Sequence, residues 1–259
     1  MKKKIQDKIL ALRKSILLIF FLFSFLEMIQ ISILDRFTIV ATLPIIIYFL
    51  VSVFIISPIF LFNQNYIGNN LMEYVIFTIS FMIYSAYNFL LTSVFISIEK
   101  IWDIHFFLSI IMLFFFVTGL VLGNIFTNKN DLILIEKDIL LRGNEIEIKK
   151  FNPWARLNLD KAPWLRKPLK SFGHILVFFI IFIGGSAAGL SLAVVEIFRR
   201  TEILGQEIDI YAFLFFILGT PVGIAAGVVL APLFCYLTRW RKLVKKVRQT
   251  YGSYTVIYN

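Results

Sequence analysis

Six long runs with few or no charges constrain this chain more than any other feature of its sequence. They cover residues 15–34, 39–62, 72–97, 104–126, 173–198 and 210–237. Each is long enough to cross a hydrocarbon layer of about 30 Å as a helix, which takes about 20 residues. Hydrophobic residues make up 59% of the 259 residues, against about 45–50% in soluble domains. The sequence therefore predicts an all-α polytopic membrane protein with about six transmembrane helices.

The distribution of Lys and Arg predicts how these helices are oriented. Six lie in residues 1–14, ten in 127–172 and six in 238–259, against four in the remaining loops. Cytoplasmic loops are enriched in Lys and Arg, so we expect both termini in the cytoplasm. The first run is too long for a signal peptide and lacks a small-x-small cleavage site, so we expect it to be retained. Richness in Phe, Ile, Lys and Asn suggests an AT-rich, bacterial genome, and we expect the protein in the inner (cytoplasmic) membrane.

The same pattern divides the chain into five segments. A basic cytoplasmic N-terminal segment, 1–14, precedes the first four helices in 15–126. A cytoplasmic module, 127–172, separates them from a Gly-rich helix pair in 173–237, and a basic cytoplasmic tail, 238–259, ends the chain.

The module contains the signature of a small β-hairpin between the fourth and fifth helices. Polar and apolar residues alternate from Glu145 to Lys149, as in a strand with one covered face. Gly143-Asn144 precedes this run and is typical of a two-residue hairpin turn. Residues 132–135 are a possible third strand. Because an isolated hairpin is marginally stable in water, we expect the strand-like run Tyr254–Tyr258 of the C-terminal tail to join the sheet.

Basic and Trp residues near the inner membrane surface form a candidate contact region for headgroups or a partner. Such residues suit the headgroup layer. They could equally dock an acidic cytoplasmic protein, or a partner that carries nucleic acid, or serve only to orient the helices. The candidates are Trp154, Arg156, Trp164, Arg166, Lys167, Arg239, Arg241 and Lys245.

Small residues recur at every fourth position in the last two predicted helices. Small-xxx-small series let helix backbones approach closely in a membrane. The first four helices are bulky and Phe-rich, which suggests that the last two lie at the centre. The series is either a contact between these two helices or a seam between subunits of a homo-oligomer or pore, and Pro221 favours a kink there. The residues are Gly184, Gly185, Gly189, Gly219, Gly223 and Gly227.

Polar residues also lie inside the predicted spans. Glu27 in the first helix is expensive to bury in a membrane, and Gln30 lies on nearly the same face. The third helix carries a polar stripe that includes Tyr84, Tyr87 and Asn88. A polar face that meets Glu27 would supply hydrogen bonds. This cluster is either structural or a proton- or cation-coupled site or ligand pocket.

Enzymatic signatures are missing from the sequence. One Cys and two His residues exclude a disulfide framework and a Cys/His zinc site. There is no HExxH motif, no phosphate-binding glycine loop and no nucleophile with a following base. We therefore expect no enzymatic activity, no cofactor and no metal.

Two functional hypotheses follow from these features. The first is a membrane subunit that oligomerises through its Gly-rich helices and presents a basic face to a soluble cytoplasmic partner, as an anchor, sensor or pore-forming effector. Envelope-stress and phage-defence complexes contain such subunits. The second is a permease subunit, driven by an ATPase or coupled to an ion at Glu27. A six-helix architecture alone does not separate them.

Overall fold

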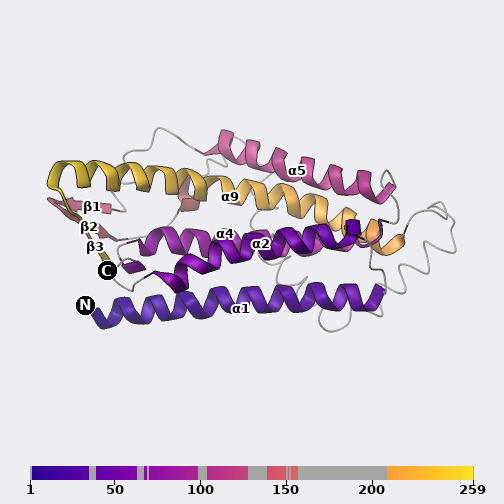
Figure 1. Cartoon of the computed structure of the whole chain (residues 1–259). Helices are drawn as coiled ribbons and strands as arrows, with labels where there is room; N and C mark the ends of the chain where they lie inside the picture. The colour runs from indigo at the N-terminus through magenta and orange to yellow at the C-terminus, as the bar shows by residue number, and fades with distance from the viewer. Residues whose placement is uncertain are drawn as a thin grey trace.

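A computed structural model shows a bundle of long, roughly parallel and antiparallel helices with a small sheet at one end (Figure 1). It describes residues 2–34, 39–62, 67–68, 70–98, 104–127, 139–149, 151, 153–156 and 209–258. The helices are α1 (Lys2–Leu34), α2 (Ile39–Leu61), α4 (Leu71–Phe95), α5 (Ile104–Phe126) and α9 (Ile210–Tyr251), with a short 3-10 helix η1 (Pro153–Arg156). The strands are β1 (Ile139–Arg142), β2 (Glu145–Ile148) and β3 (Thr255–Tyr258).

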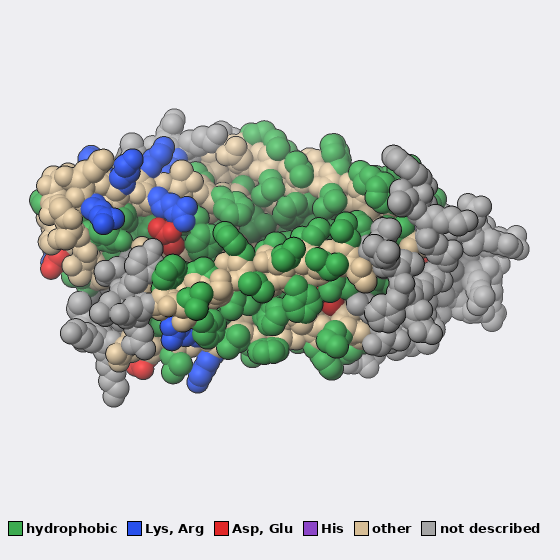
Figure 2. All heavy atoms as spheres, in the orientation of Figure 1, with side chains coloured by type: hydrophobic (Ala, Val, Ile, Leu, Met, Phe, Trp, Pro, Cys, Tyr) green, Lys and Arg blue, Asp and Glu red, His purple; other side chains and the backbone are tan. Residues whose placement is uncertain are grey.

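Five of the described helices are long and apolar enough to cross a membrane, which makes this a membrane-embedded protein. Their candidate spans are Gln6–Gln30, Thr42–Leu61, Leu71–Phe95, Ile104–Phe126 and Ala212–Tyr251. Apolar side chains cover the middle of the molecule in the view of Figure 2, while Lys and Arg gather at the end that carries the sheet. The predicted span 173–198 lies outside the described residues.

Two helices extend beyond their predicted spans without a break. α1 begins at Lys2 and therefore includes residues 2–14 of the basic segment. Its buried apolar residues lie in one stripe at spacings of three and four, which holds the basic turns against the bundle. They are Ile9, Leu12, Ile16, Ile19 and Phe23. α9 continues through Pro221 and Pro232 to Tyr251, well past residue 237.

The Gly face of α9 packs against α4 and α5 of the same chain. A Cβ on Gly227 would lie 2.5 Å from the backbone of Leu120 and Phe116, and a Cβ on Gly223 would lie 2.9 Å from the Tyr87 ring. Gly219 faces the Met112 side chain. These contacts support helix packing within one chain, and they leave the seam between subunits without support at these three residues. Gly184, Gly185 and Gly189 lie outside the described residues.

α5 supplies the other half of this contact. Gly119 and Gly123 are four residues apart, and a Cβ on either would collide with the backbone of α9 at Ile224 or Val228. α4 is also central, since 56% of its candidate span is buried, against 22% for α2. The suggestion that the first four helices are peripheral is therefore wrong for α4. α5 packs on α9 through its Gly residues, but only 22% of its candidate span is buried.

The three strands form one sheet in the order β1-β2-β3. β1 and β2 pair antiparallel through the turn Gly143-Asn144, and Gly143 has the positive φ of 62° that such turns require. β3 pairs parallel to β2, so the C-terminal tail completes the sheet as the run Tyr254–Tyr258 predicted. Ile146 and Val256 are buried against α9 beside Trp240. Residues 132–135 lie outside the described part of the chain.

At the opposite end, Asp209 joins three helices. Its carboxylate accepts a hydrogen bond from Ser97, just beyond α4, over 2.9 Å, and its backbone N–H donates to His105 Nε2 of α5 over 2.9 Å. The carboxylate also lies 3.5 Å from the Ala212 backbone nitrogen in the first turn of α9. Asp209 thus starts α9 while fixing it to α4 and α5.

Candidate functional site: an intramembrane polar cluster

Glu27 is the centre of a polar cluster where α1 meets α4. Its side chain is 1% exposed. The Asn88 side-chain amide donates a hydrogen bond of 2.8 Å to Glu27 Oε1. Asn88 lies seven residues before the end of α4, or about 10 Å along the helix axis. The carboxyl group is therefore inside the apolar part of the bundle rather than at its rim.

Further polar groups surround this pair. The Gln30 amide donates to Ser93 Oγ over 2.5 Å, one turn beyond the contact between Glu27 and Asn88. The Tyr84 ring stacks on Tyr48 of α2, with their centroids 6.1 Å apart, and both tyrosines lie within electrostatic range of Glu27. Three helices therefore contribute to the cluster.

Tyr87 does not join this cluster. Its ring stacks on Phe116 of α5 at 4.8 Å and contacts Gly223 of α9. Successive helix residues are rotated by about 100°, so Tyr87 and Asn88 face different neighbours. The predicted polar stripe therefore splits between two interfaces of α4.

Sequence reasoning missed the contribution of α2 and of Ser85 and Ser93 in α4. Tyr48 is fully buried between Phe81 and Tyr84, and its hydroxyl lies 3.4 Å from Ser85 Oγ. Ser52 is also fully buried and donates to the Tyr48 carbonyl. The sequence did contain a signal for this contribution, because Tyr48 and Ser52 are polar residues four positions apart in an otherwise apolar run.

Several buried polar atoms of the cluster remain unsatisfied. Glu27 forms no ion pair with a described Lys or Arg residue. Buried polar atoms are almost always paired, and each exception calls for an explanation such as local strain, a bound water molecule or ion, or a chemical role. The atoms of this cluster without a hydrogen-bond partner among the described residues include Glu27 Oε2, Gln30 Oε1 and the Tyr84 hydroxyl.

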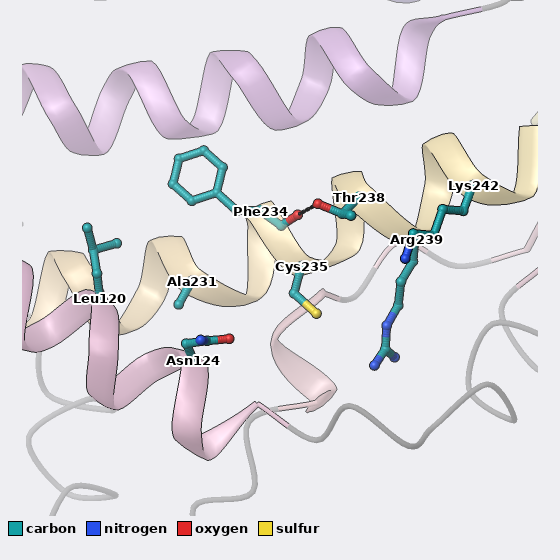
Figure 3. Close-up of a pocket in the computed structure, with 8 residues that line it drawn as sticks. All are labelled: Leu120, Asn124, Ala231, Phe234, Cys235, Thr238, Arg239 and Lys242. Carbon is teal, nitrogen blue, oxygen red and sulfur yellow. Dashed lines mark hydrogen bonds between the residues drawn. The ribbon is translucent and has the colours of Figure 1, made fainter. Parts of the chain in front are cut away.

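At the sheet end, Arg239 belongs to a groove between α5 and α9 (Figure 3). Lys242 lines the same groove, and Lys245 is exposed one turn further along α9. The Trp154 indole N–H donates to the Val229 carbonyl of α9 over 3.2 Å. Trp154 is therefore packed on a helix rather than lying free along the membrane surface. The Arg156 side chain, Trp164, Arg166 and Lys167 lie outside the described residues.

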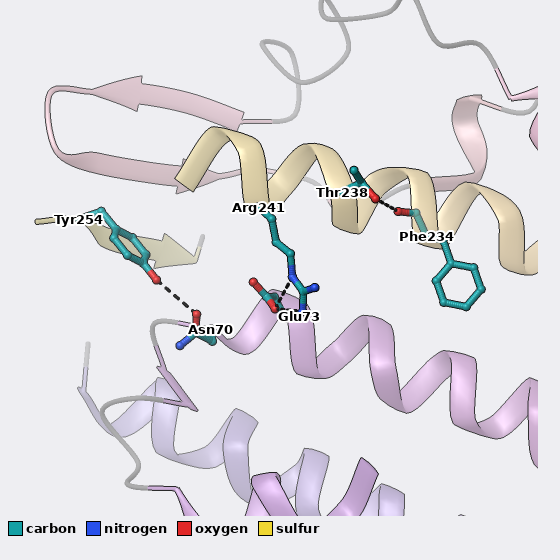
Figure 4. Close-up of polar contacts among 6 residues, drawn as sticks. All are labelled: Asn70, Glu73, Phe234, Thr238, Arg241 and Tyr254. Carbon is teal, nitrogen blue, oxygen red and sulfur yellow. Dashed lines mark hydrogen bonds and ion pairs between the residues drawn. The ribbon is translucent and has the colours of Figure 1, made fainter. Parts of the chain in front are cut away.

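Arg241 has a partner within its own chain (Figure 4). Its guanidinium donates two hydrogen bonds, of 3.0 and 2.8 Å, to Glu73 Oε2 at the start of α4. Nearby, the Tyr254 hydroxyl lies 3.3 Å from Asn70 Oδ1. These contacts fix α9 and β3 to α4, and Arg241 takes part in this junction while its side chain stays 56% exposed.

No group of three His, Cys, Asp or Glu side chains that could hold a metal occurs within the described ranges. Compared with protein-family models, curated proteins and solved structures, the chain gives no match. The polar cluster around Glu27 is the chemically most distinctive part of the described structure.

Proposed function

We propose that this chain is the membrane-spanning part of a transport system, a non-enzymatic permease in which Glu27 takes up and releases a proton. One observation carries the proposal: a 1% exposed carboxyl group inside the apolar bundle has Asn88 as its one hydrogen-bond donor among the described residues. Ionisable residues in membrane spans are costly and usually serve proton or ion pathways.

The two oxygens of Glu27 have different surroundings, which suits proton exchange. Oε1 accepts from Asn88, while Oε2 has no partner among the described residues. A proton on Oε2 removes the charge without disturbing the hydrogen bond to Oε1. Proton binding and release would therefore switch the α1–α4 contact between a neutral and a charged state, and a charged group in low dielectric is strongly penalised.

Proton uptake by proteoliposomes tests this function. A potassium gradient with valinomycin drives the uptake, and a trapped pH-sensitive dye reports it. We expect uptake by the native protein and by Glu27→Asp, and its loss in Glu27→Gln. Glu73→Gln is the matched control, because Glu73 lies in the ion pair at the sheet end. Undiminished uptake in Glu27→Gln would refute the proposal, and a requirement for Na⁺ would indicate a cation site instead.

A second candidate function rests on the sheet end. There the C-terminal tail closes a folded sheet beside an exposed cationic helix that includes Lys242, Lys245 and Lys246. We propose that this end faces the cytoplasm of a bacterial cell and presents the hairpin module to a soluble protein partner. Homo-oligomerisation would then involve surfaces other than the Gly face of α9.

Copurification under mild detergent tests the second candidate. Lys245→Glu should release a bound acidic protein, whereas Asn124→Ala, on α5, should retain it. A stoichiometric ATPase in the complex would support both candidate functions. It would be the soluble partner bound at the sheet end, and it would supply the energy for transport by the permease. Native protein that elutes as a bare monomer would count against the docking role.

A further inference from the structure

A groove between the end of α5 and the middle of α9 has a lining that changes from apolar to cationic along its length. It measures about 540 Å³. Leu120, Ala231 and Phe234 supply the apolar part, and Thr238, Arg239 and Lys242 follow along α9. One helical turn rises about 5.4 Å, so the chemistry changes within about two turns.

The groove lies where the apolar part of the bundle ends. α9 carries no charged residue from Ile210 to Thr238, and Arg239 is its first charge. Asn124, in the last turn of α5, faces the same space as Cys235 (Figure 3). A boundary of this kind places the cations at the level of lipid headgroups and the apolar floor at the level of acyl chains.

The charge of the lining selects the kind of headgroup. Arg239 and Lys242 line the groove together with neutral polar side chains, and its described lining residues include no Asp or Glu. The Arg239 and Lys242 side chains leave α9 in different directions (Figure 3), so a phosphodiester in the groove is attracted from two sides, whereas the ammonium group of a zwitterionic headgroup would be repelled. Basic pockets between transmembrane helices bind anionic headgroups in the same way.

A second groove at the sheet end also has an apolar lining with two cationic side chains. It measures about 420 Å³ and lies between α1, α4 and β2. Lys8 and Lys149 line it together with apolar residues that include Leu12, Leu71 and Val75. Two separate interfaces of the bundle therefore pair an apolar floor with two cations at one end of the molecule.

We infer that the α5–α9 groove is a binding site for an anionic phospholipid. Its phosphodiester contacts Arg239 and Lys242, and its first acyl carbons lie along Phe234 and Leu120. The lipid fixes the C-terminal part of α5 to α9 just beyond their Gly contact. This role is independent of proton exchange at Glu27.

Native mass spectrometry of the full chain in detergent, titrated with phosphatidylglycerol or phosphatidylcholine, tests the site. We expect tighter binding of phosphatidylglycerol. Lys242→Gln should weaken that binding about fivefold, since one cation near a membrane surface contributes about 1 kcal/mol. Lys246→Gln is the matched control, because it removes the same charge from the same exposed stretch without lining the groove. It should change binding by less than about twofold.

A second pair of variants adds a negative charge, inside the groove at Thr238 and outside it at Thr250. Thr238→Glu places a carboxylate beside the phosphodiester and should abolish the preference for phosphatidylglycerol, whereas Thr250→Glu should not. Equal binding of the two lipids by the native protein would overturn the site. So would equal effects of Lys242→Gln and Lys246→Gln, and so would displacement of the lipid by inorganic phosphate alone.

Discussion

At the scale of single residues, the pair formed by Glu27 and Asn88 determines how stable the α1–α4 contact is. Asn88→Ala removes the hydrogen-bond donor to Oε1 and leaves a buried acceptor unsatisfied, which costs about 1–3 kcal/mol. Glu27→Gln removes the charge at constant shape, so we expect equal or higher stability. Unfolding in mixed detergent micelles measures both effects.

Asn124→Ala serves as the control for this pair, because Asn124 is exposed near the end of α5. It should change the unfolding free energy by less than about 0.5 kcal/mol. If Asn88→Ala changed the free energy of unfolding as little as this control, the hydrogen bond to Glu27 would not contribute to stability.

The residues of the polar cluster were partly predictable from the sequence. Glu27, Gln30 and Asn88 stand out because polar groups are rare in apolar runs. The positions of Tyr84 and Tyr87 were not predictable, because the sequence does not say which neighbour each side of α4 meets. Tyr48 was missed since one tyrosine in an apolar helix resembles a rim residue until its buried surroundings are known.

At the scale of helices, the three glycines Gly219, Gly223 and Gly227 of α9 should differ in their sensitivity to Ala. Gly227→Ala should destabilise the protein most, by about 1–3 kcal/mol, because its Cβ would meet the backbone of α5. Gly223→Ala should cost less, since the Tyr87 ring can shift. Gly219→Ala meets only the flexible end of Met112 and gains helix propensity, so it should be close to neutral.

Unfolding of the three Gly→Ala variants under identical conditions gives this order. A reversed order, with Gly219→Ala the most damaging, would mean that the α5–α9 contact is not the close one described. If Gly227→Ala instead abolished a homo-oligomer without changing the stability of the monomer, the glycines of α9 would lie at an interface between subunits.

The glycine spacing in α9 indicated close packing but not the partner. Gly119 and Gly123 carry the same four-residue signal in α5, yet the many Phe residues around them suggest a lipid-facing helix. The sheet was easier to predict, because Gly143-Asn144 and the alternation after it are local signals. The parallel pairing of β3 with β2 depends on where α9 ends, which no local pattern gives.

At the scale of the whole molecule, the sheet and the Asp209 junction lie at opposite ends of the bundle (Figure 1). We expect them on opposite sides of the membrane, with the sheet in the cytoplasm, because Lys and Arg are concentrated at the sheet end. In a Cys235→Ser background, Ile104→Cys should react with an impermeant thiol reagent in intact cells. Asn144→Cys, in the hairpin turn, should react only after the cells are opened.

Labelling of both cysteines from the same side would contradict this arrangement, because the two ends could not then face opposite compartments. Labelling of Asn144→Cys alone in intact cells would reverse the orientation while leaving the bundle as described.

The central claim is that Glu27 exchanges a proton inside the bundle, and infrared difference spectroscopy between alkaline and acidic pH tests it most directly. In the reconstituted native protein we expect a protonated-carboxyl band that disappears in Glu27→Gln, shifts in Asn88→Ala, and persists in Glu73→Gln. A carboxyl band that is the same in Glu27→Gln as in the native protein would contradict the claim.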